Sequence, residues 1–449
     1  MLVIVSDLHF CDNTLGRTIS AGAFEVFRAT LANMAYSASW RLAPRKQQRY
    51  EPVRHVDIVL LGDVLDLIRS TTWIANRVRP WSKQDDRFCA TVMQVAADVL
   101  DNNEDALAAL RRTACDLTLP AAVRGKPSRK RQPVDVRVHY VVGNHDWFLH
   151  LPDRRFNALR RRVKDAMGLC NNPSRPFPHD PSSSPALRAA LSAHDVVARH
   201  GDKFDPINFH GDRKEASVGD AVVVELVCGF FDAVNSALGS ELGPACLSAL
   251  REVDNVRPAT AIPKWIFSTI RRTCHDPDLR SRVERIWKAS VAEFLNLPIV
   301  QKQDRPYPFE QIDRLQSGLR LSQVLGLSNA AKVANLTVWD YVFGRESYAK
   351  HALNEPDIAN GTARFVVYGH THHHEIVPIQ RTATGIEQFY INSGTWRRIN
   401  EIGERDRRAM QFLDYNVMTT VAFYKGTERK GRRFEVWTGA LDNVTGDLR

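Results

Sequence analysis

Residues 2–9 read LVIVSDLH, a short apolar run that ends in a polar cluster containing Asp7 and His9. Four more apolar runs end in the same way. They cover residues 56–61, 136–142, 195–199 and 364–368, and GDVLD, GNHD, HGD and GHTH follow them in that order. Short apolar runs that stop at Gly, Asp, Asn or His are typical of buried strands. The sequence therefore predicts five strands with polar side chains at their carboxyl ends.

Helical patterns separate the first of these strands. Apolar residues recur at steps of three and four over residues 24–35 and 88–112. Alternating strands and helices indicate an α/β catalytic domain, in which ligands bind beyond the carboxyl ends of the strands. After GHTH, four short apolar segments predict closing strands, at residues 388–391, 411–414, 418–423 and 433–438.

Three segments depart from this alternation. Residues 216–360 contain mostly helical patterns, at 221–238, 279–297 and 311–324, and separate HGD from GHTH. We therefore expect catalytic segments at 1–215 and 361–449, with a helical insertion or cap between them. Residues 124–133 (RGKPSRKRQP) predict an exposed loop, and the Pro- and Ser-rich residues 171–185 predict irregular structure.

The composition is that of a folded, soluble protein: 44% of the 449 residues are hydrophobic and 25% are charged. No run approaches the roughly 18 uncharged apolar residues of a membrane span. Residues 221–231 come nearest but contain Glu225, so we expect a buried helix.

The N-terminus lacks the basic flank and cleavage site of a secretory signal. The seven cysteines show no CxxC spacing, which indicates reduced thiols and a cytoplasmic protein.

The net charge of +10 favours anionic partners: phosphorylated small molecules, nucleic acid or an acidic membrane surface. A basic background unrelated to any partner explains the charge equally well. An apolar groove in the cap would favour a lipid-linked substrate and permit peripheral membrane contact. Residues 222–231 and 265–270 are candidate linings of such a groove, although buried core is the simpler interpretation of both.

The polar clusters contain residue types that bind metal ions. Asp7 and His9 are one residue apart at a strand end, so both side chains point to the same side. Asp63 has two carboxylate oxygens with which to bridge two ions. Neutral donors are available from the Asn144 amide and from the imidazoles of His200, His370 and His372. Mixed Asp, Asn and His ligation suits Mn, with Fe or Zn as alternatives, better than Ca or Mg.

Two ions about 3.5–4 Å apart activate a water and clamp the oxygens of a phosphate. His145 follows Asn144 directly, which places an imidazole beside the ions but facing elsewhere. There it can stabilise the transition state or protonate the leaving oxygen. Asp146 or Asp66 can orient His145 or a ligand histidine, so Asp146 joins His145 as a candidate catalytic residue.

Taken in order, the five clusters resemble the calcineurin-like metallophosphoesterase superfamily. The matching motifs are D-x-H at 7–9, G-D-x-x-D at 62–66, G-N-H-D at 143–146, H-G-D at 200–202 and G-H-T-H at 369–372. The resemblance reaches from residue 1 to about residue 395 and leaves the helical insertion uncovered. It implies a four-layer αββα sandwich with a dinuclear site and with His145 as the catalytic histidine. It also implies two ligand sets: Asp7, His9, Asp63 and His372 for one metal, and Asp63, Asn144, His200 and His370 for the other.

Within this superfamily the chain is most similar to the UDP-2,3-diacylglucosamine hydrolases, through HGD, a helical insertion before GHTH, and the INSGTWRR segment at 391–398. The insertion is longer than the helical lid of that branch, and GNHD stands where those enzymes commonly have GNRD. The resemblance therefore implies the reaction, a metal-dependent hydrolysis of a phosphomonoester, phosphodiester or nucleotide-linked pyrophosphate. It leaves the substrate open.

Some assignments have competitors. A second HGD lies at 210–212, but His200 follows an apolar strand and His210 does not, so we expect His200 to be the ligand. Arg397 and Arg398 lie where they can meet a substrate phosphate, or they belong to a solvated basic face.

Two other functions compete with the phosphoesterase. A nuclease of the same superfamily would use the basic segments 154–164 and 429–433 to follow a DNA or RNA backbone. A non-catalytic scaffold would have lost metal ligands, yet all seven candidate residues are present.

Overall fold

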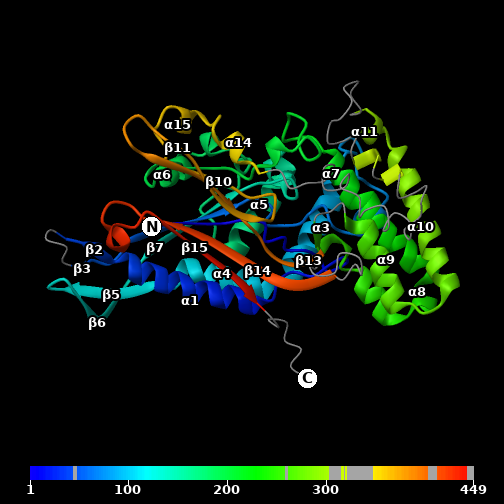
Figure 1. The fold of residues 1–449 in the computed structure, drawn as a ribbon, viewed down its shortest axis with the longest axis horizontal. Helices are drawn as coiled ribbons and strands as arrows, with labels where there is room; N and C mark the ends of the chain where they lie inside the picture. The colour runs from blue at the N-terminus through cyan, green and yellow to red at the C-terminus, as the bar shows by residue number, and fades with distance from the viewer. Residues whose placement is uncertain are drawn as a thin grey trace.

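The computed structural model describes residues 1–43, 48–257, 261–302, 315–317, 319–320, 347–402 and 412–441. The fold is mixed α/β, as predicted from the sequence, with one large sheet, one smaller sheet and two hairpins (Figure 1). Most of the predicted helix 311–324, and residue 411 of a predicted strand, lie outside the described residues.

The large sheet contains the first three predicted strands side by side. Its order is β7 (Asp135–Val141), β4 (His55–Leu61), β1 (Leu2–Val5), β14 (Phe412–Phe423), β13 (Trp396–Ile402) and β9 (Val256–Arg257), with β15 (Phe434–Leu441) also paired to β14. Strands β1, β4 and β7 are parallel, whereas β14 runs antiparallel to β1. The carboxyl ends of the three parallel strands therefore meet at one edge of the sheet, where their polar clusters begin.

The smaller sheet contains the other two predicted strands. Its order is β11 (His374–Arg381), β12 (Glu387–Ser393), β10 (Phe365–Tyr368) and β8 (Val196–Ala198), and β10 is parallel to both β8 and β12. The two sheets pack against each other through one apolar cluster. Ile4 and Val59 contribute to it from the large sheet, and Ala198 and Val367 from the smaller one.

Helices cover the outer faces of both sheets. The large sheet packs on α1 (Ala21–Ala38), α3 (Phe88–Asn102), α4 (Glu104–Cys115) and α5 (Asn157–Met167) through the largest apolar cluster. The smaller sheet packs on α14 (Ala349–Ala352) and α15 (Pro356–Ala359). The single helical pattern at 88–112 thus forms two helices. They separate at Asn103, whose side-chain amide donates hydrogen bonds to the Val99 and Cys11 carbonyls.

The prediction of a loop at 124–133 was wrong. Strand β6 (Lys126–Pro133) pairs antiparallel with β5 (Thr118–Val123). The turn between them is Arg124–Gly125, with φ of 51° and 76°, as a type I′ hairpin requires. Strand β6 is largely exposed, so its main-chain pairing leaves no apolar pattern in the sequence.

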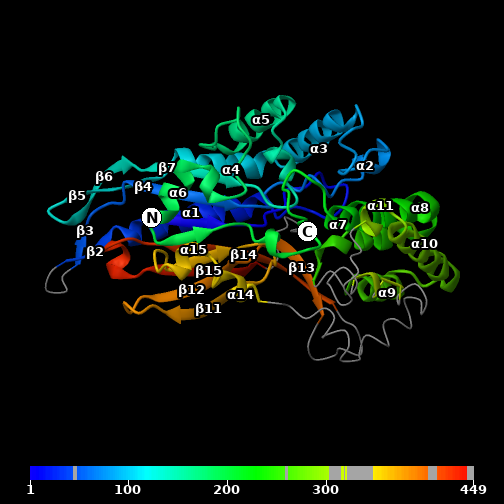
Figure 2. The same cartoon turned by 90° about the horizontal axis from the view of Figure 1, so that it is seen from above.

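Helices between residues 218 and 301 of the predicted insertion form a compact group at one end of the molecule (Figures 1 and 2). The predicted bound of 360 was too late, because α14 and α15 cover the smaller sheet. They share an apolar core, and their bounds are α7 (Val218–Ala221), a π-helix (Val222–Cys228), α8 (Gly229–Leu250), α9 (Ile262–Thr273), α10 (Pro277–Leu295) and α11 (Pro298–Gln301). Phe230 and Trp265, which represent the two candidate groove linings, are buried in this core. Strand β9 joins the insertion to the large sheet.

One helical stretch, Val218–Asn255, is long and apolar enough to cross a membrane by length and composition, and no such span was expected from the sequence. Half of its most apolar window is buried within the protein. Core helices of soluble proteins meet the same criterion, so this stretch is weak evidence for a membrane span.

Candidate metal centre

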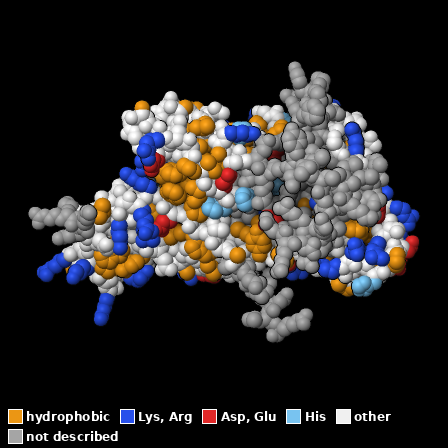
Figure 3. All heavy atoms as spheres, viewed as in Figure 1, with side chains coloured by type: hydrophobic (Ala, Val, Ile, Leu, Met, Phe, Trp, Pro, Cys, Tyr) orange, Lys and Arg blue, Asp and Glu red, His pale blue; other side chains and the backbone are white. Residues whose placement is uncertain are grey.

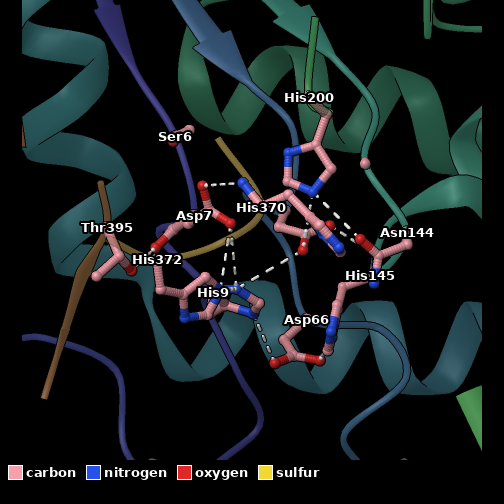
Figure 4. Close-up of polar contacts among 12 residues, drawn as sticks. Ser6, Asp7, His9, Asp66, Asn144, His145, His200, His370, His372 and Thr395 are labelled. Carbon is pink, nitrogen blue, oxygen red and sulfur yellow. Dashed lines mark hydrogen bonds and ion pairs between the residues drawn. The ribbon is translucent and has the colours of Figure 1, made fainter. Parts of the chain in front are cut away.

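The loops after five strands bring the seven predicted ligands to one place (Figure 4). Ligand atoms of Asp7, His9, Asp63 and His372 all lie within 4.8 Å of one another. Ligand atoms of Asp63, His200 and His370 form a second group, which lies within the same distance of 4.8 Å. Asp63 belongs to both groups, so its carboxylate lies between two places where a cation can be held.

In the first group, nitrogen and oxygen atoms that can bind a metal lie close to one another. His372 Nε2 is 3.0 Å from His9 Nε2 and 3.2 Å from Asp7 Oδ1. His9 Nε2 is also 3.7 Å from Asp63 Oδ2. Asp7 Oδ1 is buried and accepts no hydrogen bond from any described residue. A buried carboxylate oxygen without a partner is costly, and a divalent cation at this point would satisfy it.

In the second group, His200 is fixed through its outer nitrogen. Its Nδ1 donates to the Leu61 carbonyl at 3.0 Å, which directs Nε2 toward the centre. Nε2 is 3.2 Å from both Asp63 Oδ2 and Asn144 Oδ1. His370 Nε2 is 3.0 Å from Asp205 Oδ2. The other ring nitrogen of His370, Nδ1, is therefore the one left to bind a metal. A carboxylate behind a ligand histidine is a common support in metal sites.

The second HGD motif lies outside both groups. His210 is exposed, and its Nε2 accepts a hydrogen bond of 3.3 Å from the backbone N–H of Val218. His200 is 1% exposed and borders Asp63. The structure therefore brings His200 to the candidate centre and leaves His210 at the start of the helical insertion.

The backbone at the centre is strained. Five of the seven residues have left-handed φ, with values of 56° for Asp7, 48° for His9, 51° for Asp63, 68° for His370 and 59° for His372. This region is unfavourable for residues other than glycine, and such strain concentrates at functional sites. The strain turns side chains that follow a strand toward a common point, which a regular extended chain would not do.

The glycines of the motifs allow the loops to approach closely. A Cβ on Gly62 would lie 2.5 Å from His200 Cγ, and one on Gly143 would lie 2.7 Å from the Asp63 backbone nitrogen. A Cβ on Gly369 would lie 2.6 Å from Asp7 Oδ2. Real Cβ atoms do not approach so closely. Steric crowding therefore explains why glycine precedes Asp63, Asn144 and His370 in the motifs.

His145 lies beside the two groups and is held by Asp66. Its Nδ1 is 2.8 Å from Asp66 Oδ1, while Asp66 Oδ2 is 3.0 Å from His9 Nδ1. Burial by itself lowers the pKa of His145, but the charges of Asp66 and Asp63 raise it to about 9. The imidazole is therefore protonated at neutral pH in the metal-free protein.

Asp146, the other candidate catalytic residue, supports the loops. Its Oδ1 accepts from the Gly143 N–H at 2.6 Å, and its Oδ2 accepts from the Val64 N–H at 2.9 Å and the Tyr140 hydroxyl at 2.6 Å. These bonds join the GDVLD loop to the GNHD loop. The imidazole of His145 is hydrogen-bonded to Asp66 and not to Asp146.

A buried ionic network lies behind His9 and Asp66. Arg69 Nε is 3.0 Å from Asp66 Oδ2, and Arg69 Nη1 is 2.9 Å from Asp254 Oδ2. Arg397 Nη2 is 2.5 Å from the same oxygen of Asp254. Asp254 belongs to the helical insertion, in the 3-10 helix Val253–Asn255. The insertion thus supplies the carboxylate that balances two arginines beside the candidate centre.

The two arginines proposed to meet substrate lie on opposite sides of β13. Arg397 is 4% exposed. Burial, followed by the positive charge of Arg397, lowers the pKa of His9 to about 3. Arg398 is partly exposed and pairs with Asp414 across the strands. Strand alternation explains the difference, because neighbouring residues point to opposite faces.

The segment after GHTH holds the ligand loops in place, a role that sequence reasoning missed. Thr395 Oγ1 and the Trp396 N–H both donate to the Asp7 carbonyl, at 2.8 and 3.1 Å. Asn392 Nδ2 donates to the Gly369 carbonyl at 2.9 Å. INSGTW therefore connects the loop of Asp7 to the loop of His370.

Burial opposes charge throughout the candidate centre. It raises the pKa of Asp7 to about 6, although His200 partly offsets this rise. A bound divalent cation would add the positive charge that stabilises the ionised carboxylate, and would so remove the conflict. The donor set, the unsatisfied Asp7 oxygen and the crowded glycine loops fit such a cation.

A comparison of the sequence with models of protein families found no match, and a search of curated proteins found none either.

Proposed function

We propose that the protein is a dinuclear-metal-dependent phosphoesterase, which hydrolyses a phosphomonoester, a phosphodiester or a nucleotide-linked pyrophosphate. The observation that carries the proposal is the position of Asp63, which belongs to two groups of metal-ligand side chains at once. Asp7, His9 and His372 would complete one ion site, and Asn144, His200 and His370 the other. When bound, two such ions activate a water and stabilise the charge of a phosphoryl group. Mn, Fe and Zn suit the mixed donors.

The chain itself would supply proton transfer. His145 Nδ1 is hydrogen-bonded to Asp66, so Nε2 is the nitrogen left to meet the leaving oxygen. An imidazolium held in this way can donate a proton to that oxygen or stabilise the negative charge that develops. Asp66 would orient His145 and His9 together, because its two oxygens bond one imidazole each.

We also propose membership of the calcineurin-like metallophosphoesterase superfamily. The succession of helices, large sheet, smaller sheet and helices supports the four-layer sandwich expected of that superfamily. The substrate within the phosphoester class stays open, because the insertion buries both apolar segments considered as groove linings.

The position of the basic segment 429–433 does not favour the nuclease alternative. Glu428, at the start of the 3-10 helix Glu428–Gly431, pairs with the N-terminal amine of Met1, at the amino end of β1. The candidate ligands follow the opposite end of that strand. In Figure 3 several histidines reach the surface near the middle of the face, and lysines and arginines are spread elsewhere over it.

Metal analysis of the purified protein, followed by a phosphoester panel with added Mn, tests the proposal. The panel comprises p-nitrophenyl phosphate, bis-p-nitrophenyl phosphate, nucleotides, UDP-sugars and DNA. We expect about two ions per chain and hydrolysis of at least one small phosphoester that stops on chelation. A folded protein that binds no divalent ion with Mn, Fe or Zn supplied would refute the proposal. Activity confined to DNA, together with salt-sensitive DNA binding, would support the nuclease instead.

A further inference from the structure

A second cluster of His, Asp and Cys side chains lies on strands β4 and β7 and on the segment that follows α5. Cys170 Sγ is 3.3 Å from His139 Nδ1, and His139 Nε2 is 2.9 Å from Asp57 Oδ1. The other oxygen of Asp57 is 2.9 Å from His55 Nε2, and His55 Nδ1 is 2.8 Å from Asp135 Oδ2. A thiol is therefore aligned with an imidazole, which is in turn held by a carboxylate.

Cys170 is an exposed residue, and its partners are buried. Cys170 is exposed, whereas His139 is 4% and Asp57 is 5% exposed. The segment of Cys170 runs beside strand β7: the Cys170 N–H donates to the Val138 carbonyl at 2.9 Å, and Asn171 Oδ1 accepts from the Tyr140 N–H at 2.8 Å. Cys170 is thus fixed on both sides in an exposed segment.

The hydrogen bonds to Asp57 define which nitrogens of His139 and His55 carry protons. A carboxylate only accepts, so Asp57 receives one N–H from His139 and another from His55. The remaining nitrogen of His139, Nδ1, faces the sulfur and donates to it when the imidazole is charged. Burial lowers the pKa of His139, but the bonds to Asp57 and Cys170 raise it to about 9. An imidazole hydrogen-bonded to a thiol is an arrangement that activates cysteine as a nucleophile.

We propose that Cys170 is a reactive thiol that hydroperoxides oxidise, with His139 and Asp57 as its positioning residues. In this reaction the sulfur attacks the hydroxyl oxygen of the peroxide, an S–O bond forms and the O–O bond breaks. The sulfur loses two electrons and becomes a sulfenic acid. The departing alkoxide takes the proton of the His139 imidazolium and leaves as an alcohol, or as water from hydrogen peroxide. The proposal is independent of the metal centre.

Alkylation rates in the native protein provide the first test. Cys115 is the matched control, because it is also an exposed free thiol but has no imidazole hydrogen-bonded to it within the described residues. Tryptic peptides 113–124 and 165–188 report the two cysteines separately. With limiting iodoacetamide at pH 7, we expect Cys170 to react on the order of tenfold faster, because the His139 imidazole beside its sulfur activates the thiol. In denaturant the two rates should become equal. Equal rates in the native protein would overturn the proposal without requiring any variant.

Two variants assign the effect to His139. The substitution His139→Gln should reduce the alkylation rate of Cys170 to that of Cys115. The control His194→Gln removes another buried histidine, whose Nδ1 bonds the Ala190 carbonyl, and should leave the rate unchanged. Equal slowing in both variants would show a general loss of structure and would contradict the role of His139.

Oxidation provides the final test. After treatment with hydrogen peroxide, dimedone should label peptide 165–188 and not peptide 113–124, and Cys170→Ser should abolish the label. An absent adduct, or one of equal yield on both peptides, would refute oxidation by hydroperoxides.

Discussion

Strands β4 and β7 are associated with two groups of His and Asp side chains, and the two groups differ in what they can do. Beyond the carboxyl ends of these strands, Asp63 faces His200 and His9, and a buried oxygen of Asp7 accepts no hydrogen bond from the described residues. Nearer the amino end of β4, Asp57 also contacts two imidazoles, yet each of its oxygens accepts one N–H. In the first group, atoms that can bind a metal converge, as a cation requires, whereas the second is a satisfied chain that ends in a thiol. Residue type alone does not distinguish them.

Asp63→Ala is the most severe test of this comparison. It removes the carboxylate common to both ion sites, so we expect bound metal and activity to disappear together. The loss of activity should exceed the 10–100-fold typical of residues that only support ligands. Metal analysis and a phosphoester assay on folded protein measure both. Asp57→Ala, on the same strand, is the control and should retain metal and activity. A loss of metal in the control alone would reverse the roles of the two groups.

His145→Ala should separate chemistry from metal binding. We expect turnover to fall by about 10²–10⁴-fold, as for the loss of a proton-transfer residue, while the metal content stays at the wild-type value. Steady-state kinetics measure the turnover, and metal analysis of the same protein measures the metal content. Loss of metal in this variant would contradict the assigned role, since it would make His145 a ligand.

Asp66→Asn should have a smaller effect, because Asp66 acts through its neighbours. We expect turnover at saturating metal to fall by about 10–100-fold. An anion favours the protonated imidazole, so its removal lowers the pKa of His145 and should move the alkaline limb of the pH–rate profile to lower pH. Asp146→Asn is the control and should leave that limb in place. A shift in the control and not in Asp66→Asn would return the orienting role to Asp146.

The smallest predicted effect concerns His139 and stability. Its pKa is raised in the folded protein, against the effect of burial, by hydrogen bonds to Asp57 and Cys170. This contribution is fully present below the unfolded value near 6.5 and is lost as pH rises through about 9. Urea unfolding at pH 6.5 and pH 9 should show the advantage of wild type over His139→Gln shrinking by about 1–3 kcal/mol. An advantage that grows with pH would contradict a charged His139.

The amino-acid sequence by itself determined the mixed α/β fold and the five strands that precede the polar clusters. It also identified the residues that meet at the centre, because parallel strands of one sheet bring their carboxyl ends to a common edge. The hairpin at 124–133 escaped prediction since its exposed strand pairs through the main chain.

Only the tertiary structure decided which carboxylate serves which imidazole. Asp66 and Asp146 are equally plausible partners of His145 in the sequence, but Asp146 is occupied by Val64, Gly143 and Tyr140. Asp205 and Asp254 reach the centre, directly or through Arg69, from segments far along the chain. Cys170 likewise meets His139 across 31 positions. Contacts of this kind depend on how loops pack and where their side chains point, and no local pattern of residues records either.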